Sequence, residues 1–162
     1  MTTQFTRQEL LQTQTFQTLR RPGLAVDWTA GADFDIFTVT GVIVVSHLFG
    51  IVTTLIAGAI VPFVEITTVV PAATVPLCAL ALSLDTDVAG TIVGMSGLIA
   101  GVLTASAVGA MTLEAVNTWA GNLIVLTAGV INVNNAIAST GGVVDWYITY
   151  LPMSTGGEVT LL

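Results

Sequence analysis

Positive charge is confined to the start of this chain. All three basic residues lie within the first 21 of its 162 positions, and the sequence contains no Lys. They are Arg7, Arg20 and Arg21. From Pro22 onward there are nine carboxylates, and His47 is the only side chain there that can become cationic. Pairs of fixed opposite charges therefore cannot form within that part. We interpret the chain as an arm, residues 1–31, followed by a body, residues 32–162, that is built to pack.

The composition supplies more apolar material than one compact domain of this length needs. Apolar residues make up 54% of the sequence and charged residues 8%, against about 45–50% and about 25% in average soluble proteins. Two explanations compete: a membrane protein, or a subunit that buries large surfaces against neighbours, as obligate interfaces do. The second explanation predicts a homo-oligomer.

A membrane-spanning segment is the first explanation to weigh. The stretch Val42–Ile60 is apolar apart from a few Ser, His and Thr residues, and about 18 apolar residues are enough for a candidate span. Against it, no Lys or Arg follows position 21 to set a topology. The apolar residues are rich in Val, Ile and Thr, which favour strands. We therefore favour a soluble β-rich assembly without a membrane.

Alternating apolar residues indicate strands in the body. Phe37, Val39, Gly41, Ile43 and Val45 share one face of an extended segment, which Gly50 interrupts further on. The clearest alternation comes late, where Val144 shares a face with three larger side chains that we predict to lie in a core or interface. These are Trp146, Ile148 and Tyr150.

Regular turn signals complete the prediction of the fold class. Gly, Pro, Asn and Asp residues separate about eight to ten short apolar runs, which is typical of all-β sandwiches and barrels. The sequence thus predicts an all-β fold, a β-sandwich or jelly roll with an N-terminal arm. Residues Leu98–Ala120 are rich in Ala and Gly, and periodicity does not decide there between a loop and a short helix.

The arm combines the positive charges with apolar anchors. Thr6 and Glu9 match a capping box, so a short helix from about Arg7 competes with an extended arm, although the many Thr residues weaken the helix. We predict that the arm docks onto an acidic surface, either a shell or the body of an adjacent copy. A disordered tail is the alternative. The predicted docking residues are Phe5, Arg7, Leu11, Phe16, Leu19, Arg20 and Arg21.

The inventory of reactive side chains argues against an enzyme. His47 is the one His and lies in an apolar strand pattern, so we expect it to pack in a core or interface. Cys78 is the one Cys, and we expect a small buried hydrophobe. Asp85 and Asp87 are the better of two Asp pairs for calcium, but without the spacing of a calcium loop. We therefore predict no metal, no cofactor and, for so acidic a body, no nucleic acid.

Three blocks of the sequence resemble small virion structural proteins of tailed bacteriophages. They are Ile36–Val42, Leu48–Thr54 and Gly142–Ser154. The segments Pro76-Leu77-Cys78, before an acidic turn, and Gly90-Thr91-Ile92 are similar too. The resemblance spans most of Phe34–Leu162 and does not cover the arm. It departs from the looser pattern after Gly58, where this chain is richer in apolar residues.

The resemblance implies a non-enzymatic protein of the mature particle, best matched by a decoration (cement) protein on the capsid exterior. Such a protein is made in the host cytoplasm and binds the major capsid protein. It is commonly a trimer, so a homotrimer is favoured. Two alternatives stay open: a tail or fibre component of the virion, and a small integral membrane protein.

Overall fold

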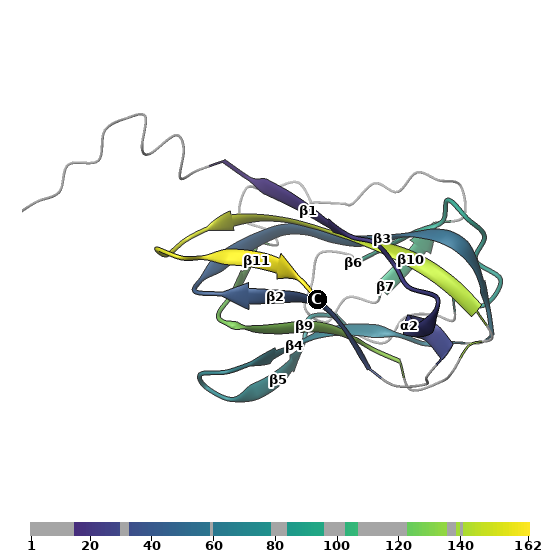
Figure 1. The fold of residues 1–162 in the computed structure, drawn as a ribbon, viewed down its shortest axis with the longest axis horizontal. Coiled ribbons are helices and arrows are strands. Elements are labelled where there is room, and N and C mark those ends of the chain that lie inside the picture. The colour runs from purple at the N-terminus through teal and green to yellow at the C-terminus, as the bar shows by residue number, and fades with distance from the viewer. Residues whose placement is uncertain are drawn as a thin grey trace, which may run out of the picture.

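The fold of this chain is built almost wholly of β-strands. The structure is a computed structural model that describes residues 15–29, 33–58, 60–78, 84–95, 103–106, 123–135, 139 and 141–162. In this described part, the one helix is the four-residue α2 (Val26–Thr29). The strands form two antiparallel layers (Figure 1). This confirms the all-β sandwich class that the sequence predicts.

The two layers, which we call sheet A and sheet B, differ in the length of their strands. Among the described residues, sheet A has the order β1-β10-β3-β6-β7, with β8 also paired to β3, and sheet B has the order β11-β2-β9-β4-β5. The strands of sheet A are β1 (Gln17–Arg21), β3 (Ile43–Ala57), β6 (Ile92–Met95), β7 (Leu103–Ser106), β8 (Ile124–Leu126) and β10 (Gly141–Pro152). Those of sheet B are β2 (Phe34–Thr40), β4 (Phe63–Thr68), β5 (Ala73–Pro76), β9 (Gly129–Asn134) and β11 (Glu158–Leu161).

A tight corner at Gly41 carries the chain from one sheet to the other. The sequence predicts one strand running through Gly41 from Phe37 to Val45, and this is wrong, because β2 ends at Thr40 in sheet B and β3 begins at Ile43 in sheet A. Gly41 has a φ of 61°, which side chains with a Cβ adopt at a cost. A Cβ there would also lie 2.6 Å from the Ser154 Oγ.

The pair β3–β10 is the long central ribbon of sheet A. Gly50 lies inside β3 rather than interrupting it, opposite Trp146. A Cβ at Gly50 would come within 2.5 Å of the Val144 Cγ1 and 3.3 Å of the Trp146 ring. Glycine is therefore needed here because the Val144 side chain of the partner strand, and beside it the Trp146 ring, occupy the space that a side chain would take.

A bulge in β3 overturns the expected position of His47. The register steps from His47 opposite Thr149 to Val45 opposite Tyr150, which leaves Ser46 as an extra residue. A bulge shifts the alternation of faces by one residue. Val45 and Leu48 consequently both point into the core, and His47, which strict alternation places with Val45, is exposed.

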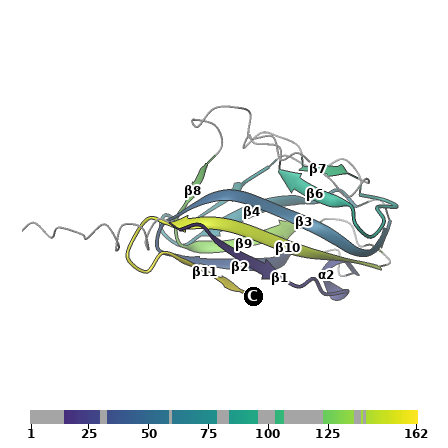
Figure 2. The ribbon, with the colours of Figure 1, turned by 90° about the horizontal axis from the view of Figure 1, so that it is seen from above.

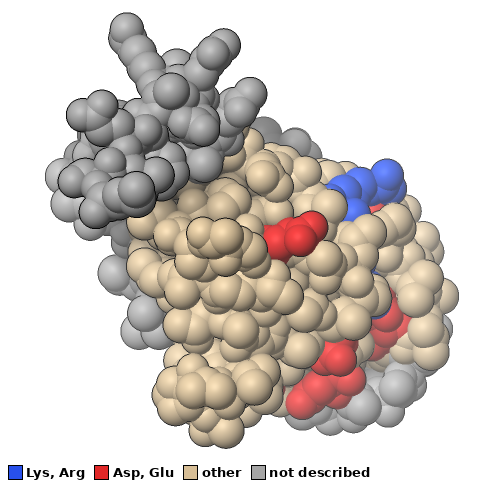
Figure 3. Space-filling model, turned by 60° about the vertical axis from the view of Figure 1, so that its left-hand side comes forward, with Lys and Arg blue, Asp and Glu red and all other residues tan. Residues whose placement is uncertain are grey.

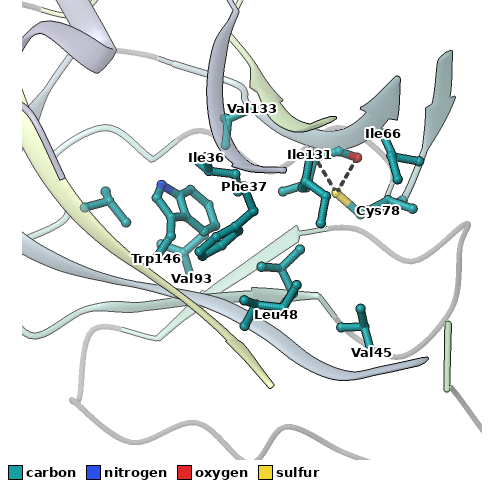
Figure 4. Packing of buried hydrophobic residues seen from close by; sticks show 14 of the residues in the cluster. Ile36, Phe37, Val45, Leu48, Ile66, Cys78, Val93, Ile131, Val133 and Trp146 are labelled. Carbon is teal, nitrogen blue, oxygen red and sulfur yellow. Dashed lines mark hydrogen bonds between the residues drawn. The ribbon is translucent and has the colours of Figure 1, made fainter. Parts of the chain in front are cut away.

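The core lies between the two sheets. Trp146, Leu48 and Val93 of sheet A face Ile36, Phe37 and Ile131 of sheet B (Figure 4). Cys78 is 1% exposed, which confirms the expected buried position; the Val64 N–H donates to its Sγ at 3.1 Å. Burial raises the pKa of the Cys78 thiol, so it is held in its neutral form.

The body begins earlier in the chain than the predicted boundary at residue 31. Strand β1 pairs with β10 along its whole length. Trp28 of helix α2 is fully buried in the core cluster and packs edge-on against Phe34, with ring centroids 5.0 Å apart. Of the ambiguous stretch Leu98–Ala120, only the residues of β7 are described, and these form a strand. Figure 2 shows α2 and β8 at opposite ends of the sandwich.

Candidate docking surface

Residues Gln17–Arg21 of the predicted arm form the strand β1 at one edge of sheet A. Leu19 pairs with Ile148 and packs against the core. The next residue, Arg20, pairs with Tyr147 and points to the outer side. Phe16, just before β1, is 51% exposed. The predicted docking residues Phe5, Arg7 and Leu11 lie outside the described residues.

Arg20 forms an ion pair within its own chain. Its Nη2 lies 2.6 Å and its Nε 3.1 Å from the Asp145 Oδ2. The Gly23 N–H donates to the other oxygen of this carboxylate at 2.9 Å. Desolvation by burial raises the pKa of Asp145, but the donors at Gly23 and Arg20 outweigh it and hold the pKa below its usual value. The same contact raises the pKa of Arg20.

Arg21 is buried in a second ion pair, with Asp27. Its Nη1 and Nη2 lie 2.6 and 3.2 Å from the two oxygens of Asp27, which also accepts the Leu24 N–H at 2.9 Å. The Nε of Arg21 donates to the Leu162 carbonyl at 3.4 Å. The Arg21 guanidinium lies 5.8 Å from the centroid of the Phe34 ring. We call Arg21, Leu24, Asp27 and Leu162 the clasp.

These two ion pairs show which carboxylates the two Arg side chains bind, which the sequence does not predict. Arg20 and Arg21 bind carboxylates of their own chain in this structure, which removes them from the set available to a partner. Asp27 and Asp145 are the functional partners that sequence reasoning missed. A signal existed, because Arg21 and Asp27 are only six positions apart across Pro22-Gly23, but nothing in the sequence placed Asp145 beside β1.

The aromatic side chains predicted for a core or interface lie in the core of this chain. Trp146, Ile148 and Tyr150 are at most 3% exposed and face sheet B together with Val144. The Tyr150 hydroxyl donates to the Gln17 Oε1 at 2.8 Å. This hydrogen bond joins the first residue of β1 to β10 on the core side of sheet A. The Arg20–Asp145 pair joins the same two strands on the outer side.

The other carboxyl groups do not gather into a metal site in the described residues. No three His, Cys, Asp or Glu side chains there lie close enough together to hold an ion. The Asp85 Oδ1 accepts the Gly58 N–H at 3.1 Å, and burial raises the pKa of Asp87. Burial and the nearby charge of Asp33 raise the pKa of Glu65.

One corner of the sandwich is apolar and without charge. The β4–β5 hairpin forms it, and the Val69 N–H extends the β4–β9 ladder by donating to the Ala128 carbonyl at 3.0 Å. We call residues 69–76 the hairpin corner; this segment contains no ionisable side chain. In Figure 3 the lower lobe at this end is tan throughout. Its exposed apolar side chains are Val69 (65%), Val70 (78%) and Val75 (42%).

Comparison of the chain with family models, with curated proteins and with solved structures gives no match. The apolar stretch Val42–Ile60 is mostly the strand β3. Within the described ranges, no helix has both the length and the apolar character needed to cross a bilayer.

Proposed function

We propose that this chain is a non-enzymatic structural protein of a bacteriophage virion. In this proposal it is a capsid decoration protein that binds the major capsid protein on the outside of the head and stabilises the shell. It acts as a homo-oligomer, with a trimer favoured. The resemblance to small virion proteins supports the proposal, and two of the blocks that carry it, Leu48–Thr54 and Gly142–Ser154, fall largely on the paired central strands β3 and β10.

The observation that carries the proposal is the way the arm joins the body. Gln17 pairs with Tyr150, so β1 begins beside the end of β10. Residues 1–14 are therefore joined to the sandwich at a fixed place, beside the exposed Phe16. A rigid body with an attached arm can contact two neighbours at once, and linked contacts gain affinity by avidity.

In this proposal the docking element is limited to the residues before β1. Arg20 and Arg21 are engaged in the body, which leaves Arg7 as the remaining fixed positive charge of the arm. Phe5, Leu11 and Phe16 supply apolar contact on both sides of it in the sequence. An Arg can bind a carboxylate through two parallel hydrogen bonds, so we propose an acidic patch of the shell as the acceptor.

The test is a deletion that stops short of β1. Heads assembled without this chain are mixed with the full protein or with a variant lacking residues 1–14, and binding is measured by co-sedimentation. We expect about tenfold weaker binding or worse for the deletion, which corresponds to about 1.4 kcal/mol. Its circular dichroism should not change, because β1 and both ion pairs are kept.

The matched control is Val88→Asp, a substitution on an exposed loop of the body, which should bind heads like the full protein. If the deletion variant binds as tightly as the full protein, the arm is not the docking element. If the full protein binds no heads at all, the proposed function is wrong. The position of the chain in an electron-microscopy map of the particle distinguishes a head protein from a tail or fibre component.

A further inference from the structure

The hairpin corner is exposed but held in place. The Thr68 Oγ1 donates to the carbonyls of Pro71 and Ala73, at 2.5 and 3.1 Å. The Thr67 and Thr74 hydroxyls lie 3.3 Å apart across β4 and β5. The Val69–Ala128 bond joins the hairpin to the turn after β8. A surface that is ordered before binding loses less conformational entropy when a partner packs on it.

The charge of the chain limits which partner suits this surface. The net charge is −7, and both Arg side chains in the described part are bound to carboxylates of their own chain. Two copies that meet through carboxylate-bearing faces therefore repel each other with no free described cation to offset it. The nearest carboxylate in register with the hairpin corner is Glu65, opposite Pro76, and it is only 8% exposed.

We propose that the hairpin corner is the contact through which this chain binds a second copy of itself. The corner lets two acidic molecules bury apolar area without bringing their carboxylates together. Val70, the most exposed of its side chains, lies in the turn between β4 and β5. The inference deepens the homo-oligomer of the proposed function by naming its interface, and it holds or fails without any particle.

The contact is tested by the mass of the purified full chain in solution. Sedimentation equilibrium from micromolar to about 200 µM should show reversible association, since a small apolar patch supports a weak interface. Val70→Asp and Val69→Asp would each place a carboxylate in the contact. We expect each to weaken association about tenfold or more. The mass of the complex also distinguishes a dimer from a trimer.

Val88→Asp is the control, because it adds the same charge at a residue that is 50% exposed and lies outside the corner. It should associate within about twofold of the unmodified chain. Circular dichroism confirms that each variant is folded.

Three results would overturn the inference. The first is a chain that stays monomeric up to the highest concentration. The second is a control that weakens association as much as Val70→Asp, which would make the effect one of net charge. The third is a monomeric chain that floats with phosphatidylcholine vesicles, which would make the corner a lipid-binding surface. None of these results bears on attachment to heads through residues 1–14, so the two proposals fail separately.

Discussion

The clasp and the hairpin corner lie at opposite ends of the sandwich and use opposite chemistry (Figure 1). At the clasp, Arg21 and Asp27 are 5% and 6% exposed, and both charges are satisfied within the chain. At the hairpin corner, Val69 and Val70 are mostly exposed and have no charged neighbours within the segment. At the clasp the charges are satisfied by contacts within the chain. At the hairpin corner apolar area stays exposed in the single chain.

This difference separates stability from association. A buried ion pair that loses one partner leaves an uncompensated charge in a poorly solvated place, which strongly destabilises the fold. An exposed apolar side chain is already in water, so changing it costs the monomer little. Substitutions at the clasp should therefore affect unfolding, and substitutions at the hairpin corner should affect contacts between molecules.

The largest effect is expected for Asp27→Asn at the clasp. The substitution removes the negative charge that compensates the buried Arg21, so the free energy of unfolding should fall by about 3–5 kcal/mol. Urea unfolding followed by tryptophan fluorescence measures it. The control is Val26→Ser, an exposed neighbour in the same helix, which should stay within about 0.5 kcal/mol. A loss below about 1 kcal/mol for Asp27→Asn would mean that the clasp is not closed in solution.

An intermediate effect is expected for Asp145→Asn, beside the clasp on β10. Asp145 accepts hydrogen bonds from Arg20 and Gly23, and hydrogen bonds to a charged group contribute about 1.5–3 kcal/mol net. The folded-state pKa of Asp145 lies below its ordinary value of 3.8. The ionised form therefore stabilises the fold above that value, and its contribution is lost as the pH falls through the folded-state pKa.

The difference between Asp145→Asn and the unmodified chain should thus shrink when urea unfolding is repeated as the pH falls below 3.8. A difference that stays constant from neutral to acidic pH would show that the carboxylate charge contributes nothing. Glu65→Gln serves as the opposite case, because the pKa of Glu65 is raised. Removing that charge should raise stability at neutral pH, and the gain should disappear in acid.

The smallest effect on stability is expected for Val70→Ser at the hairpin corner. Val70 is 78% exposed, so the free energy of unfolding of the monomer should change by no more than about 0.5 kcal/mol. The measurement is urea unfolding at a protein concentration where the chain is monomeric. A loss above about 1 kcal/mol would show that this residue stabilises its own hairpin, and would erase the contrast with the clasp.

Local patterns predicted the strands better than their connections. The alternation from Val144 to Tyr150 corresponds to β10, whose inward side chains are buried. The continuous pattern from Phe37 to Val45 hides the corner at Gly41, because a chain that crosses between two sheets keeps apolar residues on both sides of the crossing. In the sequence Gly50 resembles a break in the strand, and the positions of the Val144 and Trp146 side chains on the partner strand explain it.

The candidate site shows the same division. The sequence marked Arg20 and Arg21 as the chemistry-bearing residues of the arm, and the structure gives both a partner. Asp145 lies 125 positions from Arg20 in the chain, so no local pattern connects them. The prediction for the position of His47 was wrong because of a single extra residue, Ser46. A bulge depends on the pairing of two strands rather than on either sequence alone.

The sequence by itself determined the all-β class, the apolar character of the core strands and the segregation of positive charge, because these follow from residue type and spacing. Tertiary structure decided where the arm ends, which carboxylates its Arg residues bind and which apolar residues stay exposed. Those outcomes depend on strand order and register, which bring distant segments into contact. Val64 is buried in β4, whereas Val70, in the turn that follows β4, is exposed. Val64 belongs to the core cluster between the two sheets, and Val70 lies outside it.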